Sequence, residues 1–364
     1  MKKRFFALFL LFSLFIAGCQ TGQEANADFN TFCMETFRSY AASDSLTLNY
    51  TLMSPKKYGI TDLPDGFSSF SLHDLKQMQT STENTLARLH NFAKNNLSRE
   101  DRLLYDTLDA SLTLSQEDIR MLAHSYSFDP SSGIQAQLPV LLCEFILTDK
   151  QDYDQYFSLL KSIPAYFNSL TALEKIKQKK GTLPAATTIR HTISQCQEFI
   201  DSSGTDAIEK SFEKSINSAS FFSASEKKER LKKHRKLLSH SLFPAYKNLI
   251  AELGKLLPFA PNDGALAACT GGRAYYEYLV KEKTGTISSP DSLFQMLTKK
   301  LSESEQKLAT LAATSPSSFL TCEKHTSKYE EPKSILTHLK RNIRTDFPAL
   351  KKQTCHIRAV DSSL

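Results

Sequence analysis

The stretch DKQDYDQYFSLLKSIPAYFNSLTALEKIKQKKG, residues 149–181, decides the fold class of this chain. The apolar side chains of its first half recur at three- and four-residue steps, as on one face of an α-helix: Tyr153, Tyr156, Phe157 and Leu160. Asp152 is the expected N-cap, and Pro164 is expected to break or restart the helix. Gly181 is expected to end it in a left-handed turn. The centre of the chain therefore indicates a mainly α protein.

The same helical spacing recurs on both sides of this stretch. Capping patterns at Ser71, Ser98 and Ser289 mark helix starts, and Pro244 should kink a long helix. The further predicted helices are 29–40, 72–96, 99–119, 189–200, 208–216, 225–257, 290–311 and 335–343. Two of them, 72–96 and 99–119, are expected to form a helical hairpin. No fixed repeat period links these segments, so one multi-helix domain is predicted over residues 29–350.

The last residues depart from the helical pattern. In TCHIRAVDSSL, residues 354–364, apolar and polar side chains alternate with the period of a half-buried strand. A lone strand has no partner in a helical chain. Either the alternation is accidental, or residues 351–364 are a short β-strand at the start of a sheet-containing part that the chain does not continue.

The first residues have the layout of an export signal. Lys2, Lys3 and Arg4 precede an apolar run of about 13 residues, which is shorter than the about 20 that a membrane-spanning helix needs. The run ends in Ile-Ala-Gly-Cys at residues 16–19, which resembles the bacterial lipobox. We therefore predict a lipoprotein signal peptide at 1–18, a lipidated Cys19 and a flexible tether at 19–28, which places the protein on the extracytoplasmic face of the cell membrane. The alternative is an ordinary secreted protein with an incidental cysteine.

The charge balance excludes one class of partner. Three of the 45 Lys and Arg residues lie before Cys19, which leaves 42 against 39 Asp and Glu residues, a net charge of +3 for the mature chain. These charges are interspersed, so no nucleic-acid partner is expected. The densest basic run, residues 227–236, either contacts the cell envelope or is a solvated helix face.

The cysteines and histidines show no metal-site spacing. The six cysteines after Cys19 include no C-x-x-C pair, and they could form disulfides or remain free core thiols. None of the nine histidines is followed by glutamate, and there is no nucleophile elbow and no phosphate-binding glycine loop. We therefore assign no catalytic residue, no metal ligand and no cofactor to this chain.

Two stretches are candidates for a substrate groove. SSGIQAQLPVLLCEF, residues 131–145, and CTGGRAYYEYLVKEKTGT, residues 269–286, each combine a glycine helix start with polar or aromatic side chains. Backbone amides at a glycine start suit an anion, and tyrosines can line a groove. The candidate groove residues are Gln135, Gln137, Gly271, Gly272, Tyr275 and Tyr276. The alternatives are a loop before a core helix and a tyrosine-rich core helix with ordinary caps.

These stretches also carry a family resemblance. GIQAQLPVLLCEF, QCQEFI, FPAYKNLIAEL, GGRAYYEYLVKEKTG and DFPAL stand in the order found in the bacterial family called domain of unknown function 885, which the chain resembles over most of residues 29–364. The resemblance implies a largely helical fold, frequent lipoproteins and similarity to zinc-dependent peptidases. Full-length relatives are expected to carry a His-Glu-x-x-Pro-Gly-His zinc motif downstream of the region corresponding to 346–348, and no residue here matches it.

Three functions follow. The first is an incomplete or inactive member of a zinc-peptidase-like lipoprotein family, truncated before the catalytic motif, so that zinc is expected only in full-length relatives. The second is a lipoprotein that binds peptides or cell-wall fragments without catalysis. The third is a structural or interaction lipoprotein whose basic helix at residues 227–236 contacts the envelope. In all three, the membrane is a partner through Cys19.

Overall fold

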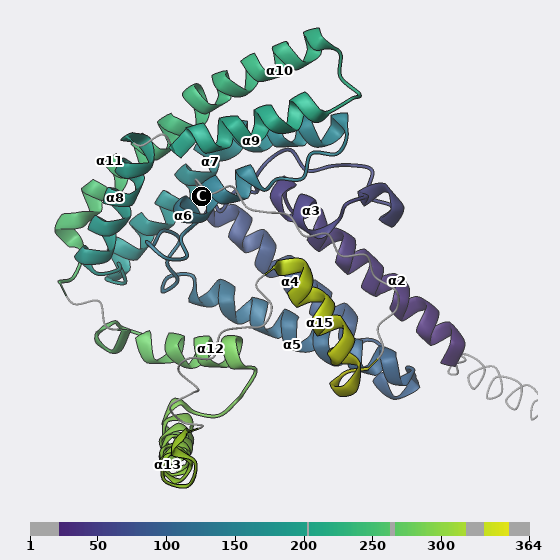
Figure 1. Ribbon diagram of the computed structural model, residues 1–364, viewed down its shortest axis with the longest axis vertical. Coiled ribbons are helices and arrows are strands. Elements are labelled where there is room, and N and C mark those ends of the chain that lie inside the picture. The colour runs from purple at the N-terminus through teal and green to yellow at the C-terminus, as the bar shows by residue number, and fades with distance from the viewer. Residues whose placement is uncertain (1–21, 202–203, 263–265, 318–330, 349–364) are drawn as a thin grey trace, which may run out of the picture. The chain divides into compact units, whose positions relative to one another are not determined.

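The computed structural model describes residues 22–201, 204–262, 266–317 and 331–348 (Figure 1). The chain divides into two compact units, Met1–Glu282 and Lys283–Leu364. No β-strand occurs in the described ranges, which confirms the predicted mainly α, multi-helix fold. The strand predicted at 351–364 and the signal and lipidation site at 1–19 lie outside the described residues.

The α-helices of the first unit are α2 (Gly22–Ala41), α3 (Ser45–Thr51), α4 (Leu72–His90), α5 (Arg99–Met121), α6 (Ile134–Cys143), α7 (Lys150–Lys180), α8 (Ala186–Asp201), α9 (Gly204–Ser218), α10 (Ala224–Leu237), α11 (Phe243–Leu256) and α12 (Gly272–Thr284), the last two residues of α12 falling in the second unit. Short 3-10 turns occur at Pro55–Tyr58, Lys94–Asn96, Leu257–Phe259 and Leu266–Ala268. α2 begins at Gly22, so residues 22–28 of the expected tether are helical, since Glu24, Ala25 and Ala27 are good helix formers.

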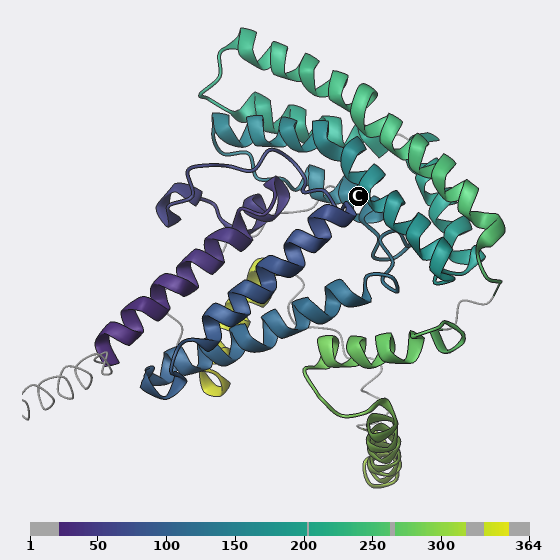
Figure 2. The ribbon, with the colours of Figure 1, turned by 180° about the vertical axis from the view of Figure 1, so that it is seen from behind.

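Helix α7 is the centre of the larger core. Figures 1 and 2 show α7 among α6, α8, α9, α10 and α11. The helix buries residues along its whole length, and Leu159, Leu160 and Ile163 are completely inaccessible to solvent. At about 25 cal/mol per Å², such burial is the main stabilising contribution to a helical domain of this size. The first unit is therefore organised around the stretch that indicated the fold class.

Two predictions about α7 are wrong in detail. The helix continues through Pro164 without a break, because Leu160, Ile163 and Phe167 on either side of it are buried in the same core. That packing outweighs the about 3 kcal/mol that an interior proline costs. The N-cap is Asp149, with Asp152 as its capping-box partner at the third helical position. Gly181 ends the helix with φ 68°, as predicted.

A second, smaller core joins α2, α4 and α5. Phe29 and Phe32 of α2 pack with Leu89 and Leu97, and Phe92 meets Phe29 edge-on with ring centroids 5.4 Å apart. α4 and α5 lie side by side as the predicted helical hairpin (Figures 1 and 2). Their N-caps are Ser71 and Ser98, as the sequence indicates. This bundle contributes one wall of the cleft described below.

The connection between α10 and α11 is a π-helical turn, Leu238–Leu242. It lies directly before Pro244, in the first turn of α11, where the sequence predicts a kink. A proline lacks the N–H that would continue the α-helical pattern, and a wider turn accommodates the lost hydrogen bond.

The second unit contains α13 (Pro290–Thr314) and α15 (Pro332–Asp346). Ser289 caps α13 with Pro290 at its first position, as predicted. No residue of α13 is buried. Among the described residues, no helix combines the length and the apolar composition required to cross a membrane.

Candidate ligand-binding cleft

A cleft of about 790 Å³ opens in the first unit, where the α2–α4–α5 bundle meets α7. Its walls come from α2, α3, α4 and the segment 67–70, with single contributions from α5, α6 and α7. Nine of the lining residues are serines or threonines: Thr36, Ser39, Ser43, Thr47, Ser68, Ser69, Ser81, Thr82 and Thr85. Four more are aromatic: Tyr40, Phe67, Phe70 and Tyr166. The cleft is large enough for a short polymer segment.

The segment that forms one wall of the cleft is fastened to α7 by serine hydroxyls. The backbone amide of Phe67 donates to Ser162 Oγ at 2.8 Å, and that of Phe70 donates to Ser169 Oγ at 3.1 Å. Gly66 adopts φ 88°, and a Cβ at this position would lie 2.4 Å from Ser162 Oγ. Only glycine satisfies both the left-handed backbone and this close approach. The wall therefore depends on Gly66 and on two serines almost 100 residues away.

The aromatic part of the cleft is preassembled. The rings of Phe67 and Tyr166 stack with centroids 4.3 Å apart and an interplanar angle of 9°. Phe70 packs against Tyr166 at 6.0 Å. Burial, aided by the charge of Asp44, raises the pKa of the Tyr166 phenol to about 12, so this ring stays neutral at physiological pH. Aromatic faces of this kind pack against apolar parts of a ligand.

Two carboxylates give the cleft a negative character. Asp44 caps α3, accepting from the backbone amides of Leu46 and Thr47 at 2.8 and 2.9 Å. Asp74 belongs to the capping box of α4, and hydrogen bonds from Ser71 and Ser69 lower the pKa of its carboxyl group. Asp74 is thus held as an anion and is unsuited to donate a proton as a general acid.

The described residues that line the cleft include no histidine, cysteine, lysine or arginine. Across the described ranges, no group of three or more His, Cys, Asp or Glu side chains is placed to hold a metal ion, so these residues do not fit a zinc site. Five of the lining hydroxyls already donate within the fold and are left to a ligand as acceptors: Thr36, Thr47, Ser68, Thr82 and Thr85. Such acceptors, together with aromatic rings and two carboxylates, can bind a neutral or cationic polar ligand that donates hydrogen bonds. The arrangement disfavours anionic ligands, since no lining cation would neutralise them.

The sequence-predicted groove residues on α6 lie elsewhere. Gln135 is buried, and its amide donates to the backbone oxygen of Asp129 at 2.6 Å and to Gln195 at 3.1 Å. The Gln137 amide donates to the backbone oxygen of Ser132. Of this stretch, Ile134 lines the cleft. The structure thus gives Gln135 and Gln137 local contacts, and their role in a groove stays a prediction.

Two of the predicted groove residues at the start of α12, Gly271 and Tyr275, lie beside His124. Gly271 (φ 79°) and Gly272 begin the helix as predicted, and a Cβ on Gly272 would lie 1.7 Å from the Leu266 backbone oxygen. Tyr275 is buried and stacks on His124 at 5.5 Å, whereas Tyr276 is half exposed. Burial raises the pKa of Tyr275 to about 12. None of these residues lines the cleft, and their proposed role also stays a prediction.

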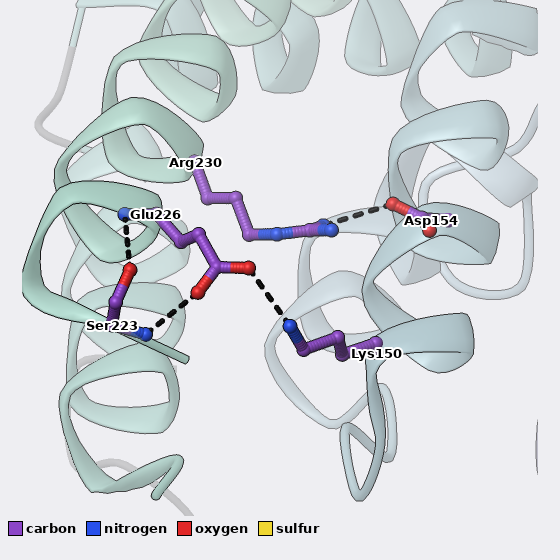
Figure 3. Close-up of polar contacts among 5 residues, drawn as sticks. All are labelled: Lys150, Asp154, Ser223, Glu226 and Arg230. Carbon is purple, nitrogen blue, oxygen red and sulfur yellow. Dashed lines mark hydrogen bonds and ion pairs between the residues drawn. The ribbon is translucent and has the colours of Figure 1, made fainter. Parts of the chain in front are cut away.

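Part of the basic run at 227–236 is used within the fold. Figure 3 shows Lys150 at the start of α7 paired with Glu226 at 2.8 Å, and Arg230 paired with Asp154 at 2.9 Å. The bond from Lys150, followed by those from Ser223, lowers the pKa of Glu226 to about 2. These contacts fasten α10 to α7. Within the run itself, Arg230 pairs with Asp154, Arg235 pairs with Glu209 of α9 at 2.5 Å, and Lys227 donates to the Asn217 backbone oxygen, so these three side chains are used inside the fold.

The cleft residues were not identified from the sequence. Serines and threonines on amphipathic helices resemble ordinary solvent-facing positions, and nothing local marks them as a set. One signal was available in α7, where Ser162, Tyr166 and Ser169 follow the i, i+4, i+7 spacing of a single helix face. Such a polar stripe on an otherwise buried helix indicates a neighbouring polar segment.

Comparison with known proteins gives a family and a fold. The sequence pattern of a bacterial protein family of unknown function, DUF885, matches residues 55–361. The crystal structure of "the putative lipoprotein from Colwellia psychrerythraea" is similar with a TM-score of 0.64 and 14% sequence identity. The similarity covers 89% of this chain and 58% of that one, so this chain spans little more than half of its structural relative. No curated protein shows significant sequence similarity.

Proposed function

Because this chain belongs to the bacterial DUF885 family, and its first unit contains a preassembled cleft, we propose that it is a lipid-anchored extracytoplasmic protein that binds peptides. The cleft carries the proposal. Its rings, hydroxyls and anions match the alternation of apolar side chains and backbone polar groups in an extended peptide. The structural relative described as a lipoprotein supports the cellular location.

The charge of the cleft narrows the ligand class. Asp44 and Asp74 face a cavity whose lining has no cation, so a peptide amino terminus or a lysine side chain is favoured over an acidic group. Uncharged glycan strands of the cell wall would meet the hydroxyls equally well but would gain nothing from the two carboxylates. We therefore expect cationic peptides to bind more tightly than acidic peptides or glycans.

We also propose that this chain does not hydrolyse peptides by itself. The family resemblance implies zinc peptidases, but the His-Glu-x-x-Pro-Gly-His pattern is absent from the 364 residues. A zinc peptidase needs ligands for the metal and a general base beside the bound water. The function that we propose for the described first unit is therefore the binding of peptides.

The binding proposal is tested by fluorescence anisotropy with labelled octapeptides of cationic, neutral and acidic composition. Ser81→Arg places a long cation in the cleft and should weaken binding of the cationic peptide at least about tenfold, or about 1.4 kcal/mol. The matched control is Thr80→Arg, an exposed neighbour on α4 outside the lining, which should leave affinity unchanged. Equal effects of both variants, or no binding of any peptide, would reject the cleft as the site.

The catalytic part of the proposal is tested separately. The purified chain is dialysed against zinc, its metal content is measured, and it is incubated with a peptide library analysed by mass spectrometry. Neither stoichiometric zinc nor cleavage is expected. Bound zinc together with peptide turnover would refute the proposed absence of hydrolysis without affecting the binding result.

A further inference from the structure

A second, smaller pocket of the first unit lies against helix α3, on the side away from the cleft. Its lining includes Ser45, Leu48 and Asn49, which follow the i, i+3, i+4 spacing of one face of α3, whereas Leu46 and Thr47 of the opposite face line the cleft. None of the described residues lines both cavities. The pocket has a volume of about 270 Å³, below the about 300–1,000 Å³ of pockets for drug-sized ligands. It therefore suits a molecule of the size of a single amino acid rather than a polymer.

The buried part of this lining is apolar and preformed. Leu48 and Phe145 are each 4% exposed, and Leu52 lines the pocket beside them. The Asn49 amide is held at both ends, because its Nδ2 donates to the Ile146 backbone oxygen at 2.8 Å and its Oδ1 accepts from the Ile146 backbone amide at 2.9 Å. A ligand therefore meets a surface that is already ordered, which lowers the entropic cost of binding.

The solvent-accessible part of the lining carries charges of both signs. Lys56 and Lys57 come from the 3-10 turn Pro55–Tyr58, and neither has an ion-pair partner among the described residues. Asp149 and Asp152 come from the start of α7. Each carboxylate accepts its capping bonds through one oxygen, Oδ1 of Asp149 and Oδ2 of Asp152, and the other oxygen has no partner in the described ranges. The pocket thus offers both cations and anions to a ligand that carries one charge of each sign.

We propose that this pocket binds a free apolar α-amino acid as the zwitterion. The apolar side chain packs against Leu48 and Phe145, the carboxylate of the ligand pairs with the two lysines, and its ammonium group pairs with the two aspartates. A fatty acid or a simple amine would leave one of these pairs of charges unmatched. The proposal is independent of peptide binding in the cleft, since the two cavities are lined by different residues.

The test is equilibrium dialysis of the purified full chain against radiolabelled leucine, for which we expect saturable binding. Ser54→Trp fills the pocket from a residue without a side-chain capping bond and should weaken leucine binding at least about tenfold. The matched control is Thr61→Trp, an exposed residue of the same loop outside the lining, which should leave leucine binding unchanged. Ser81→Arg in the cleft should also leave it unchanged, and Ser54→Trp should retain binding of the cationic octapeptide. No saturable binding of leucine, equal effects of the two Trp variants, or loss of leucine binding in Ser81→Arg would overturn the proposal.

Recognition of the zwitterion is tested with two analogues of leucine, 4-methylpentanoate, which lacks the ammonium group, and 3-methylbutylamine, which lacks the carboxylate. Each should displace labelled leucine several-fold less effectively than unlabelled leucine does. Lys57→Gln should weaken leucine binding about two- to fivefold, as expected for one exposed ion pair. Asp149→Ser removes the negative charge but keeps a good N-cap for α7, and it should weaken binding by a similar factor. Equal displacement by either analogue, or unchanged leucine affinity in both variants, would refute binding of the zwitterion.

Discussion

His234 should make this protein sensitive to mild acid. The side chain is completely buried on α10, where its ring stacks on Phe212 with centroids 4.1 Å apart and an interplanar angle of 10°. Its Nε2 contacts the Tyr156 hydroxyl at 3.2 Å, and its buried Nδ1 has no hydrogen-bond partner within the described residues. Burial, with a smaller effect of the adjacent Arg235 charge, lowers the pKa of His234 from 6.5 to about 3.

The direction and size of the effect follow from proton linkage. Because the pKa of His234 is lower in the folded state than in the unfolded state, acidification protonates the unfolded chain first. The contribution of the neutral His234 to the free energy of unfolding is therefore complete above pH 6.5 and is lost as the pH falls from 6.5 toward 3. At about 1.4 kcal/mol per pH unit, the free energy of unfolding should decrease by about 2 kcal/mol between pH 7.5 and pH 5.

The assay is urea denaturation at pH 7.5 and pH 5.0. His234→Phe retains the ring stack but removes the titrating group, so its stability should be lower at pH 7.5, where the Tyr156 hydroxyl loses its partner, and should change much less with pH. His191→Phe replaces an exposed histidine and should keep the full pH dependence. If His234→Phe loses as much stability on acidification as the unmodified chain, then His234 is not the source of the pH dependence.

Three other substitutions test features of the fold and the anchor. Gly66→Ala should reduce the unfolding free energy by about 2 kcal/mol or more, measured by urea denaturation, since the new Cβ meets Ser162 in a left-handed backbone; a neutral effect would contradict the described wall. Lys177→Met should cost about 3 kcal/mol because it leaves the buried Glu174 carboxylate uncompensated, and adding Glu174→Leu should recover part of the loss; additive losses would argue against coupling. Cys19→Ser should move the protein from membrane to soluble fractions on immunoblots, and retention in membranes would count against lipidation.

Local signals in the sequence were sufficient for most helix boundaries. Ser71, Ser98, Ser289 and Gly181 act where their side chains or backbone freedom predict, because capping is decided within a few residues. Pro164 was misjudged because tertiary burial on both sides of it is not visible in a local pattern. The error at Asp149 has a local cause: Asp149 and Asp152 are two carboxylates of one capping box, and Asp149 is the one that accepts from the amides of Gln151 and Asp152.

The cleft could not be predicted because its geometry depends on contacts between distant segments. Gly66 is an ordinary turn glycine in sequence, and its requirement arises only from the approach of Ser162. Conversely, the amides of Gln135 and Gln137 looked free for a ligand, but they bond to backbone oxygens nearby. From the sequence alone, a polar side chain that forms an internal hydrogen bond cannot be distinguished from one that binds a ligand.

The attachment of segment 66–70 to α7 has a consequence for how selectivity can change. The backbone amides of Phe67 and Phe70 are already occupied by serine hydroxyls, so a guest molecule cannot use them as donors. Discrimination between ligands then depends on side chains, among them those of α2 and α4 and the Asp44 carboxylate before α3. Substitution of single lining residues can therefore change which ligands bind, while the attachment of segment 66–70 to α7 stays unchanged.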